Sequence, residues 1–352
     1  MKLWTKLALP ALAGAVATIP LPVHADTGAA ERAGHVLIVV SGHGLDGGKT
    51  RPGFEMDELS QAYAVFTDNG LTVDIASPKG GTPVADAFDP DKPYNRRFLD
   101  DREASAKLET AQALPSVKDK TYAAIFIIGG KGAMFDLPVD LDLKHLLATT
   151  YGAGGVVGAV CHGPAALINV PMPDGSRLVA GKSVTGFSNE EEALFGKRWA
   201  AAFPVLLEDG LRGAGARFSE APMMLDHVVT DGRLVTGQNP YSTSSAAEAV
   251  VRAMGRVPVV REPFADERSI ALIARVQAGD GAGARAELAA GPSGHDVPLI
   301  AAWGHYRAKS PGADRATLKT AIEVMELASP YYKEPRLAAA LTDARQKLAE
   351  MP

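Results

Sequence analysis

The sequence contains a single cysteine, Cys161, among its 352 residues. A lone cysteine excludes a disulfide bond within the chain, so no covalent cross-link stabilises the fold. Two interpretations of the thiol stay open. It is either a small buried side chain, which is the usual state of a free cysteine, or a group that is kept for chemistry.

Runs of basic residues are also missing from the sequence. No more than two Lys or Arg residues follow one another, and the formal net charge is -5. Proteins that bind nucleic acids usually carry clustered positive charge, so we expect no nucleic-acid partner. The 46% of hydrophobic and 22% of charged residues are ordinary for a globular protein and exclude disorder on a large scale. A small molecule or a protein is the expected partner.

Apolar runs long enough to cross a bilayer are absent beyond the first 25 residues. Those residues begin with Lys2 and Lys6, continue with an apolar stretch and end in small residues before Asp26, which is typical of a secretory signal peptide. A membrane anchor is the alternative, but prolines interrupt the segment and its apolar part is short for a span. We expect residues 1–25 to be a signal peptide and 26–34 a spacer. The mature protein is then exported, to a periplasm or the medium, without membrane contact.

Short apolar segments alternate with segments of helical periodicity between residues 35 and 260. Strands are expected at 35–41, 71–77, 122–130, 155–160 and 183–188, with a final hairpin of 227–230 and 233–237. Helices are expected at 57–70, 143–155, 163–170 and 244–254. Apolar strands separated by helices are typical of a parallel sheet covered on both faces. The sequence therefore predicts a doubly wound α/β domain over residues 35–260.

From about Glu262 onward the sequence has no strand candidate. Amphipathic, alanine-rich segments follow one another with Gly or Pro between them, for example at 267–277, 298–309 and 315–328. We expect residues 261–352 to form a separate all-helical domain of four or five helices. No set of chemical groups stands out in it, so its expected role is to pack against the α/β domain or to form a homodimer.

Three of the expected strands end in unusual sequences. They are "SGHG" with His43, "GGKGAMFD" with Gly130 and Lys131, and the pair Cys161-His162. Ligands bind outside the carboxyl ends of the strands in open α/β sheets, so we expect these sequences to meet at one edge. Taken alone, the glycine-rich sequence fits a tight turn as well as an anion-binding loop. His43 likewise fits a pocket residue as well as a plain loop residue.

Cys161 lies between two small residues, Ala159 and Gly163. This is the spacing of a nucleophile elbow, in which a sharp strand-to-helix turn projects the nucleophile. A helix that begins directly after the turn would favour the thiolate. The backbone N–H of His162 would point at a developing oxyanion, and Gly130 is a candidate for the second donor. The pattern favours a catalytic thiol over a buried filler. The other histidines show no metal-ligand spacing, so no metal site is expected.

Four motifs carry a resemblance to a known family: "GGKGAMFDLP", "GGVVGAVCHGPAAL", "GKSVTGFSNEEE" and "TDGRLVTGQNP", in this order. They resemble the PfpI-type and glyoxalase III (heat-shock deglycase-like) proteins of the class I glutamine amidotransferase-like superfamily. The resemblance extends from about His35 to Gly255. It implies a flavodoxin-like α/β sandwich that carries a Cys–His–acid site and uses no metal or organic cofactor.

The resemblance also implies roles for particular residues. Cys161 matches the family nucleophile and His162 its partner. The acid of the glyoxalase III branch follows "TGF" in the motif, and its spacing falls on Glu192. The neighbouring Glu190 and Glu191 stay open as alternatives, because a slip of one or two residues would exchange them.

An early acidic residue of the same branch matches Glu58. A charged carboxylate beside a thiolate would repel it, so we expect Glu58 to be at least partly protonated and to move protons. The sequence departs from the family pattern at two places: Lys131 stands where many relatives have His, and Gln61-Ala62 where this branch often has His-Pro. Both bear on the identity of the substrate.

Three functions follow from the resemblance. The expected one is a glyoxalase III-type lyase, related to D-lactate dehydratase, that converts methylglyoxal or another small reactive carbonyl compound to a 2-hydroxy acid. The second is a cysteine amidase or peptidase, since a thiolate and an oxyanion hole also suit acyl transfer. The third is a holdase chaperone, a protein-repair protein or a redox sensor that acts on protein clients. One fold serves such different chemistries, so the sequence leaves all three open.

Overall fold

The computed structural model describes residue 1 and residues 34–351 of the chain. Apart from residues 1 and 34, the signal peptide expected at 1–25 and the spacer expected at 26–34 lie outside the described part. Within the described part, no helix has both the length and the apolar character needed to cross a bilayer.

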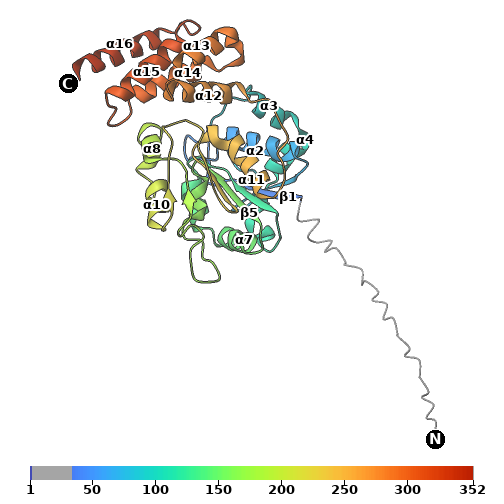
Figure 1. Ribbon diagram of the computed structural model, residues 1–352. Coiled ribbons are helices and arrows are strands. Elements are labelled where there is room, and N and C mark those ends of the chain that lie inside the picture. The colour runs from blue at the N-terminus through green and yellow to red at the C-terminus, as the bar shows by residue number, and fades with distance from the viewer. Residues whose placement is uncertain (2–33, 352) are drawn as a thin grey trace.

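A seven-stranded sheet forms the centre of the larger part of the molecule (Figure 1). Its strands stand in the order β3-β2-β1-β4-β5-β9-β8, and every neighbouring pair is parallel except the hairpin of β8 and β9. Strands β4 and β5 are buried along their whole length, as expected of parallel strands covered on both faces. The strands are β1 (His35–Val39), β2 (Thr72–Ser77), β3 (Gln112–Ala113), β4 (Ala124–Ile127), β5 (Val156–Val160), β8 (Val228–Asp231) and β9 (Leu234–Gly237).

Helices flank this sheet and complete a flavodoxin-like sandwich (Figure 1). Helices α2 (Met56–Asp68) and α11 (Thr243–Ala253) pack against each other and against the sheet, and α7 (Leu141–Gly152) packs against β4 and β5. The predicted mostly parallel α/β fold is confirmed. The smaller helices of this part are α6 (Ala133–Asp136), η1 (Leu137–Val139), α8 (Asn189–Phe195), α9 (Lys197–Ala200), α10 (Leu207–Gly213) and η3 (Pro240–Ser242).

The segment between β2 and β4 contains helices that the sequence pattern does not indicate. They are α3 (Pro93–Asp100), α4 (Arg102–Glu109) and α5 (Leu114–Val117). Helix α3 buries only Tyr94, Asn95 and Phe98, and α4 buries only Ala104. Apolar faces this short leave too little periodicity to be recognised in a sequence.

Two expected elements differ in the structure. The helix expected at 163–170 is a short 3-10 helix, η2 (Gly163–Leu167), and that expectation was wrong. The chain leaves the helical conformation at Ile168, and Asn169 then adopts a φ of 60° in the left-handed region. The strand expected at 183–188 is reduced to β6 (Ser183–Val184), which pairs with β7 (Arg217–Phe218) in a separate two-stranded sheet.

Five helices form the C-terminal part, at the top of Figure 1. Their buried face has its own hydrophobic core around Trp303 and Met325, both fully buried. This core also takes in Met223 and Leu225 from the α/β part, so the two parts are packed together. The helices are α12 (Ala265–Gln277), α13 (Gly281–Ala290), α14 (Val297–Ala308), α15 (Arg315–Ala328) and α16 (Pro335–Glu350), with the 3-10 helix η4 (Pro292–Gly294) before α14.

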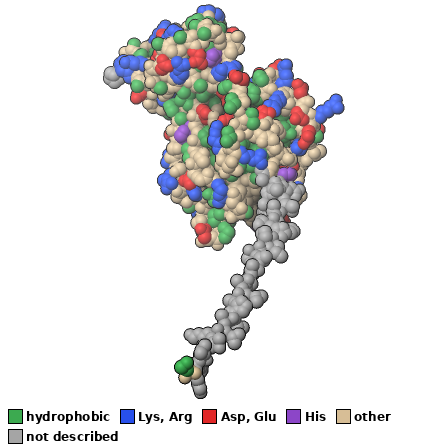
Figure 2. Space-filling model, turned by 45° about the vertical axis from the view of Figure 1, so that its right-hand side comes forward, with side chains coloured by type: hydrophobic (Ala, Val, Ile, Leu, Met, Phe, Trp, Pro, Cys, Tyr) green, Lys and Arg blue, Asp and Glu red, His purple; other side chains and the backbone are tan. Residues whose placement is uncertain are grey.

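The surface carries charges of both signs. Figure 2 shows Lys and Arg side chains interspersed with Asp and Glu side chains over the visible face of both parts. This mixture agrees with the small negative net charge of the sequence.

Candidate active site

Cys161 stands in a sharp turn between β5 and η2. Its φ of 58° lies in the left-handed region, which is costly for a residue with a side chain, by about 1–3 kcal/mol. Two backbone hydrogen bonds hold it there: its N–H donates to the Gly237 carbonyl over 3.0 Å, and its carbonyl accepts from the Phe187 N–H over 2.9 Å. The turn has the strained shape that the elbow spacing predicts. The side chain projects from the carboxyl end of β5, although the residue is only 4% exposed.

The glycine-rich loop after β4 lies directly against this turn. A Cβ atom on Gly129 would stand 2.7 Å from the His162 nitrogen and 2.8 Å from the Cys161 Cβ, so only glycine fits. Gly130 has a φ of 85°, a conformation that also favours glycine. Both Gly130 and Cys161 line the cavity, and the Gly130 backbone acts to lower the pKa of the thiol. The loop therefore lies close to the thiol.

His162 links the thiol to a buried carboxylate. Its Nδ1 lies 3.4 Å from the Cys161 sulfur, and its Nε2 lies 2.9 Å from Oε2 of Glu192. Burial lowers the pKa of His162, although the hydrogen bond to Glu192 opposes this shift. The ring is thus neutral near pH 7, with Nε2–H donating to the carboxylate and the Nδ1 lone pair facing the thiol. Phe187 stacks on the imidazole with ring centroids 4.4 Å apart and keeps it in this orientation.

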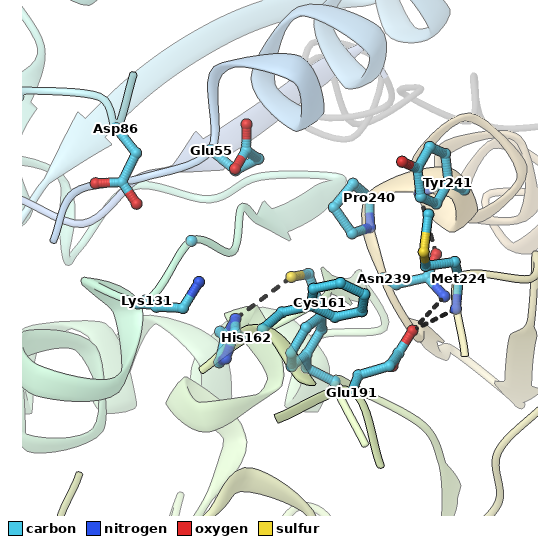
Figure 3. Close-up of a pocket in the computed structure, with 13 residues that line it drawn as sticks. Glu55, Asp86, Lys131, Cys161, His162, Glu191, Met224, Asn239, Pro240 and Tyr241 are labelled. Carbon is cyan, nitrogen blue, oxygen red and sulfur yellow. Dashed lines mark hydrogen bonds between the residues drawn. The ribbon is translucent and has the colours of Figure 1, made fainter. Parts of the chain in front are cut away.

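The three consecutive glutamates of α8 point to three different partners. Ser188 caps the helix, and the Glu191 side chain returns to the Ser188 N–H to form a capping box. Glu191 also accepts from the Met224 N–H over 2.8 Å and from Asn239 over 2.9 Å, as Figure 3 shows. Glu190 forms an ion pair with Arg307. Only Glu192 faces the histidine.

Glu58 reaches the thiol from α2. It is fully buried, its Oε2 accepts from the Gly129 N–H over 2.7 Å, and its carboxyl lies close enough to the Cys161 thiol to shift the pKa of that group. Burial, reinforced by the charge of Glu55, raises the pKa of Glu58 well above its usual range. Burial and the charge of Glu58 raise the pKa of the Cys161 thiol as well.

The expectation that a helix beginning after the turn favours the thiolate is therefore corrected. The helix η2 is a 3-10 helix of five residues, too short for a substantial dipole, and the site is buried. At rest both groups are protonated and neutral: Cys161 is a thiol and Glu58 is a carboxylic acid.

This correction has a measurable consequence for the pH dependence of the thiol. Because a raised pKa delays the formation of thiolate, the rate of alkylation of Cys161 by iodoacetamide is expected to keep rising beyond about pH 8.5, the range of an ordinary cysteine. Since the chain has no other cysteine, the mass increase of the intact protein reports this residue alone. A rate that levels off below that range would contradict the neutral resting thiol.

A cavity of about 190 Å³ opens above the sulfur. One side carries charged groups, Glu55, Asp86 and Lys131, and Figure 3 shows the Lys131 amine and the Cys161 sulfur pointing toward each other. The other side is largely apolar and is formed by Phe187, Phe195, Met224, Pro240 and Tyr241. The cavity has room for a molecule of a few heavy atoms whose reactive carbon lies at the thiol.

The family match decides which proteins this site belongs with. Residues 50–253 match the DJ-1/PfpI family. The chain belongs to the DJ-1/PfpI family. The resemblance inferred from the four motifs is confirmed, and the matched segment of this DJ-1/PfpI protein ends before α12.

Several relatives of this DJ-1/PfpI protein have names that describe an activity. The glutathione-independent glyoxalase hsp3101 of Schizosaccharomyces pombe is 35% identical over 243 residues, which are 62% of this chain and 95% of that protein. The glutathione-independent glyoxalase HSP31 of Saccharomyces cerevisiae is 32% identical over 229 residues, 59% of this chain and 91% of that protein. The crystal structure of glyoxalase III from Candida albicans superposes with a TM-score of 0.58 at 30% identity and covers 63% of this chain and 98% of that one.

Only some of the other site residues predicted for this DJ-1/PfpI protein line the cavity. Gly130 and Lys131 line the cavity together with Cys161 and His162. Of the two roles left open for His43, the pocket residue and the plain loop residue, the structure favours the second: His43 is not among the residues that line the cavity, and it stacks on Phe135 with ring centroids 4.6 Å apart. Within residue 1 and residues 34–351, no group of three or more His, Cys, Asp and Glu side chains is arranged to hold a metal ion.

Glu55 was missed from the sequence, and Glu191 was named there only as an alternative to Glu192. Glu55 precedes α2 and lines the cavity, and burial, together with the charges of Asp57 and Asp86, raises its pKa to about 7. The signal was present, because residues three apart share a helix face and Glu55 stands three before Glu58. Glu191 also lines the cavity, and burial raises its pKa to about 7. Its role depends on contacts with distant segments that no local pattern reveals.

Proposed function

We propose that this DJ-1/PfpI protein is a glutathione-independent glyoxalase that converts 2-oxoaldehydes such as methylglyoxal to 2-hydroxy acids. The observation that carries the proposal is a buried Cys161, in contact with the His162–Glu192 pair and close to Glu58, at the base of a small cavity. The names of the similar yeast and fungal proteins support the same reaction. The proposed chemistry uses no cofactor.

The first step adds the thiol to the aldehyde. The Cys161 sulfur bonds to the aldehyde carbon, and its proton passes through His162 Nδ1 to the former carbonyl oxygen, which gives a hemithioacetal. The charge that develops on this oxygen is stabilised by backbone N–H groups, for which we propose Gly130 and His162. A thiol that is neutral at rest loses its proton only as the new bond forms.

The next steps move a hydrogen between two adjacent carbons. A base removes the proton from the thiol-bearing carbon while the ketone oxygen gains a proton, which gives an enediol. The neighbouring carbon is then protonated as the hydroxyl on the thiol-bearing carbon loses its proton, which leaves a thioester of the 2-hydroxy acid. We assign these transfers to His162, which contacts the sulfur, and to Glu58, whose charge raises the pKa of the thiol. Water then cleaves the thioester, releases the acid and restores the thiol. The net reaction adds one water to the oxoaldehyde.

The role of Glu192 can be tested by a change of one atom. Glu192→Gln is expected to lower kcat by about a hundredfold, because the amide can donate to Nε2 and so favour the imidazole form with its proton on Nδ1. That form cannot accept the thiol proton. Glu192→Asp, which keeps a carboxylate, is the control and should lose less activity. Equal kcat values for the glutamine variant and the wild type would contradict this role.

The test of the reaction itself needs only the purified protein. Methylglyoxal or glyoxal is supplied without glutathione, and both the loss of aldehyde and the appearance of the 2-hydroxy acid are followed. One acid is expected for each aldehyde consumed. A panel of amides and peptides is assayed in parallel. Release of ammonia or new amines without aldehyde turnover would replace the proposal by an amidase or peptidase function.

Export of the protein is a separate proposal, which rests on the N-terminal sequence pattern alone. Expression of the full chain in a bacterial host, followed by N-terminal sequencing of the accumulated protein, tests it. The first residue is expected to be Asp26. Retention of the complete N-terminal segment would contradict cleavage.

A further inference from the structure

Helix α14 of the C-terminal part touches the helix that carries the catalytic acid. Arg307 forms an ion pair with Glu190, two residues before Glu192. Tyr306, the residue before Arg307, packs edge-on against Phe195 near the end of α8, with ring centroids 4.9 Å apart. Phe195 is part of the apolar wall of the cavity. Both contacts thus act on α8, the first near its start and the second at its end.

A third residue of α14 reaches another part of the same wall. The Trp303 side chain is fully buried, and its Nε1–H donates to the Met223 carbonyl over 2.9 Å. The next residue, Met224, has a φ of 61° and lines the cavity. Its N–H donates to Glu191. The Met224 turn is therefore held on one side by α8 and on the other by α14.

The three residues form one face of a helix. Positions 303, 306 and 307 are three and four residues apart, and such positions project from the same side. That side reaches two residues of the apolar wall, Phe195 directly and Met224 through Met223, and every residue that lines the cavity belongs to the matched segment. Because the family match ends at residue 253, α14 is an addition to the matched segment.

We infer that the Trp303–Tyr306–Arg307 face of α14 sets the width of the catalytic cavity by fixing Phe195 and Met224, and thereby selects 2-oxoaldehydes with small side chains. The three are positioning residues, since none of them lines the cavity. The inference rests on the proposed function for its substrates. The width of the cavity can also be measured without any substrate.

Alkylation of the single cysteine provides that measurement. Rate constants are determined for iodoacetamide and for the bulkier N-benzyliodoacetamide, and their ratio is compared between variants. Tyr306→Ala frees Phe195 to move outward, so the ratio of bulky to small reagent is expected to rise by about tenfold, the size of a typical steric selection in a pocket. Trp303→Phe, which keeps an aromatic ring but is smaller and loses the donor, is expected to shift the ratio in the same direction.

The matched control lies in the same helical part. Arg345→Gln removes an exposed ion pair with Glu326 and should leave the ratio unchanged. Because unfolded molecules react with both reagents without selection by the cavity, each ratio is measured well below the melting temperature of the variant, where the protein is folded. Thermal melting identifies any variant that fails to fold.

Turnover gives the second readout. In Tyr306→Ala, kcat/KM for phenylglyoxal relative to methylglyoxal is expected to rise in step with the alkylation ratio. An unchanged alkylation ratio in folded Tyr306→Ala and Trp303→Phe would overturn the inference. If the wild type turned over no aldehyde while the alkylation ratio still rose, the proposed function would fail and the role of α14 in cavity width would stand.

Discussion

Cys161→Ala is expected to abolish the turnover of methylglyoxal, with kcat at least about ten-thousandfold below the wild type. Every proposed covalent step begins or ends at this sulfur, and the chain has no second thiol to replace it. The enediol forms only while the substrate is bonded to the sulfur. The remaining rate should therefore be close to that of the reaction in solution. Progress curves that record the 2-hydroxy acid measure the loss.

Two comparisons make this expectation decisive. Cys161→Ser keeps a side chain of similar shape but offers a weaker nucleophile, and it should be nearly as inactive as the alanine variant. Both variants should melt close to the wild type, because the left-handed backbone at this position is retained and little apolar contact is lost. An alanine variant with a tenth of the wild-type kcat would show that the reaction does not proceed through the thiol.

Glu58→Gln is expected to lower kcat by about a thousandfold while it makes the thiol more reactive. The amide oxygen still accepts from Gly129, so the loop keeps its position, but the side chain can no longer move protons. The charge of Glu58 raises the pKa of Cys161, and removing it lowers that pKa. Alkylation at about pH 8 should accelerate as turnover collapses. Slower alkylation in this variant would contradict the proposed coupling of the two groups.

The same substitution should change stability in a pH-dependent way. The pKa of Glu58 is raised in the folded protein, so its contribution is fully present below the unfolded pKa and is lost as pH rises toward the folded one. Glutamine cannot ionise. The variant should therefore melt with the wild type at about pH 4 and above it at about pH 8. Glu58→Asp, which restores a carboxyl group, is the control and should remove this advantage at the higher pH.

Much of the α/β fold could be predicted because its central strands carry strong local signals. Parallel strands buried on both faces must be apolar at every position, and β4 and β5 are read directly from such runs. The turn at Asp231-Gly232 likewise reveals the β8–β9 hairpin. Local sequence therefore contains most of what determines the sheet.

The errors occur where local signals are weak or compete. Helix α3 was missed because only three of its residues are buried. The segment after the cysteine was assigned to a full helix on its apolar residues, but Asn169 breaks it. His43 follows the end of β1, as the sequence predicts, but its ring stacks on Phe135 and does not line the cavity. Side-chain direction depends on packing partners that lie far away in the sequence.

The residues of the candidate site also differ in how far local sequence predicts them. Cys161 and His162 are adjacent, so the elbow spacing could indicate both. Glu192 and Glu58 were assigned only through the family resemblance, because nothing local connects them to the cysteine. The contact of α14 with the cavity wall had no signal at all. The helical periodicity of residues 297–308 predicts that one face of the helix is buried, but it does not predict which segment packs against that face.

The two backbone hydrogen bonds at Cys161 both involve segments that are synthesised after the cysteine, so the reactive turn can form only late in synthesis. Gly237, which accepts from its N–H, belongs to β9 and leaves the ribosome long after the cysteine. Until β9 pairs with β5, nothing on that side imposes the left-handed turn, and the thiol keeps the ionisation of an ordinary exposed cysteine. A nascent chain should thus react with alkylating agents faster than the finished protein. Long-range pairing forms late in folding, so completion of the sheet both protects this thiol and prepares it for catalysis.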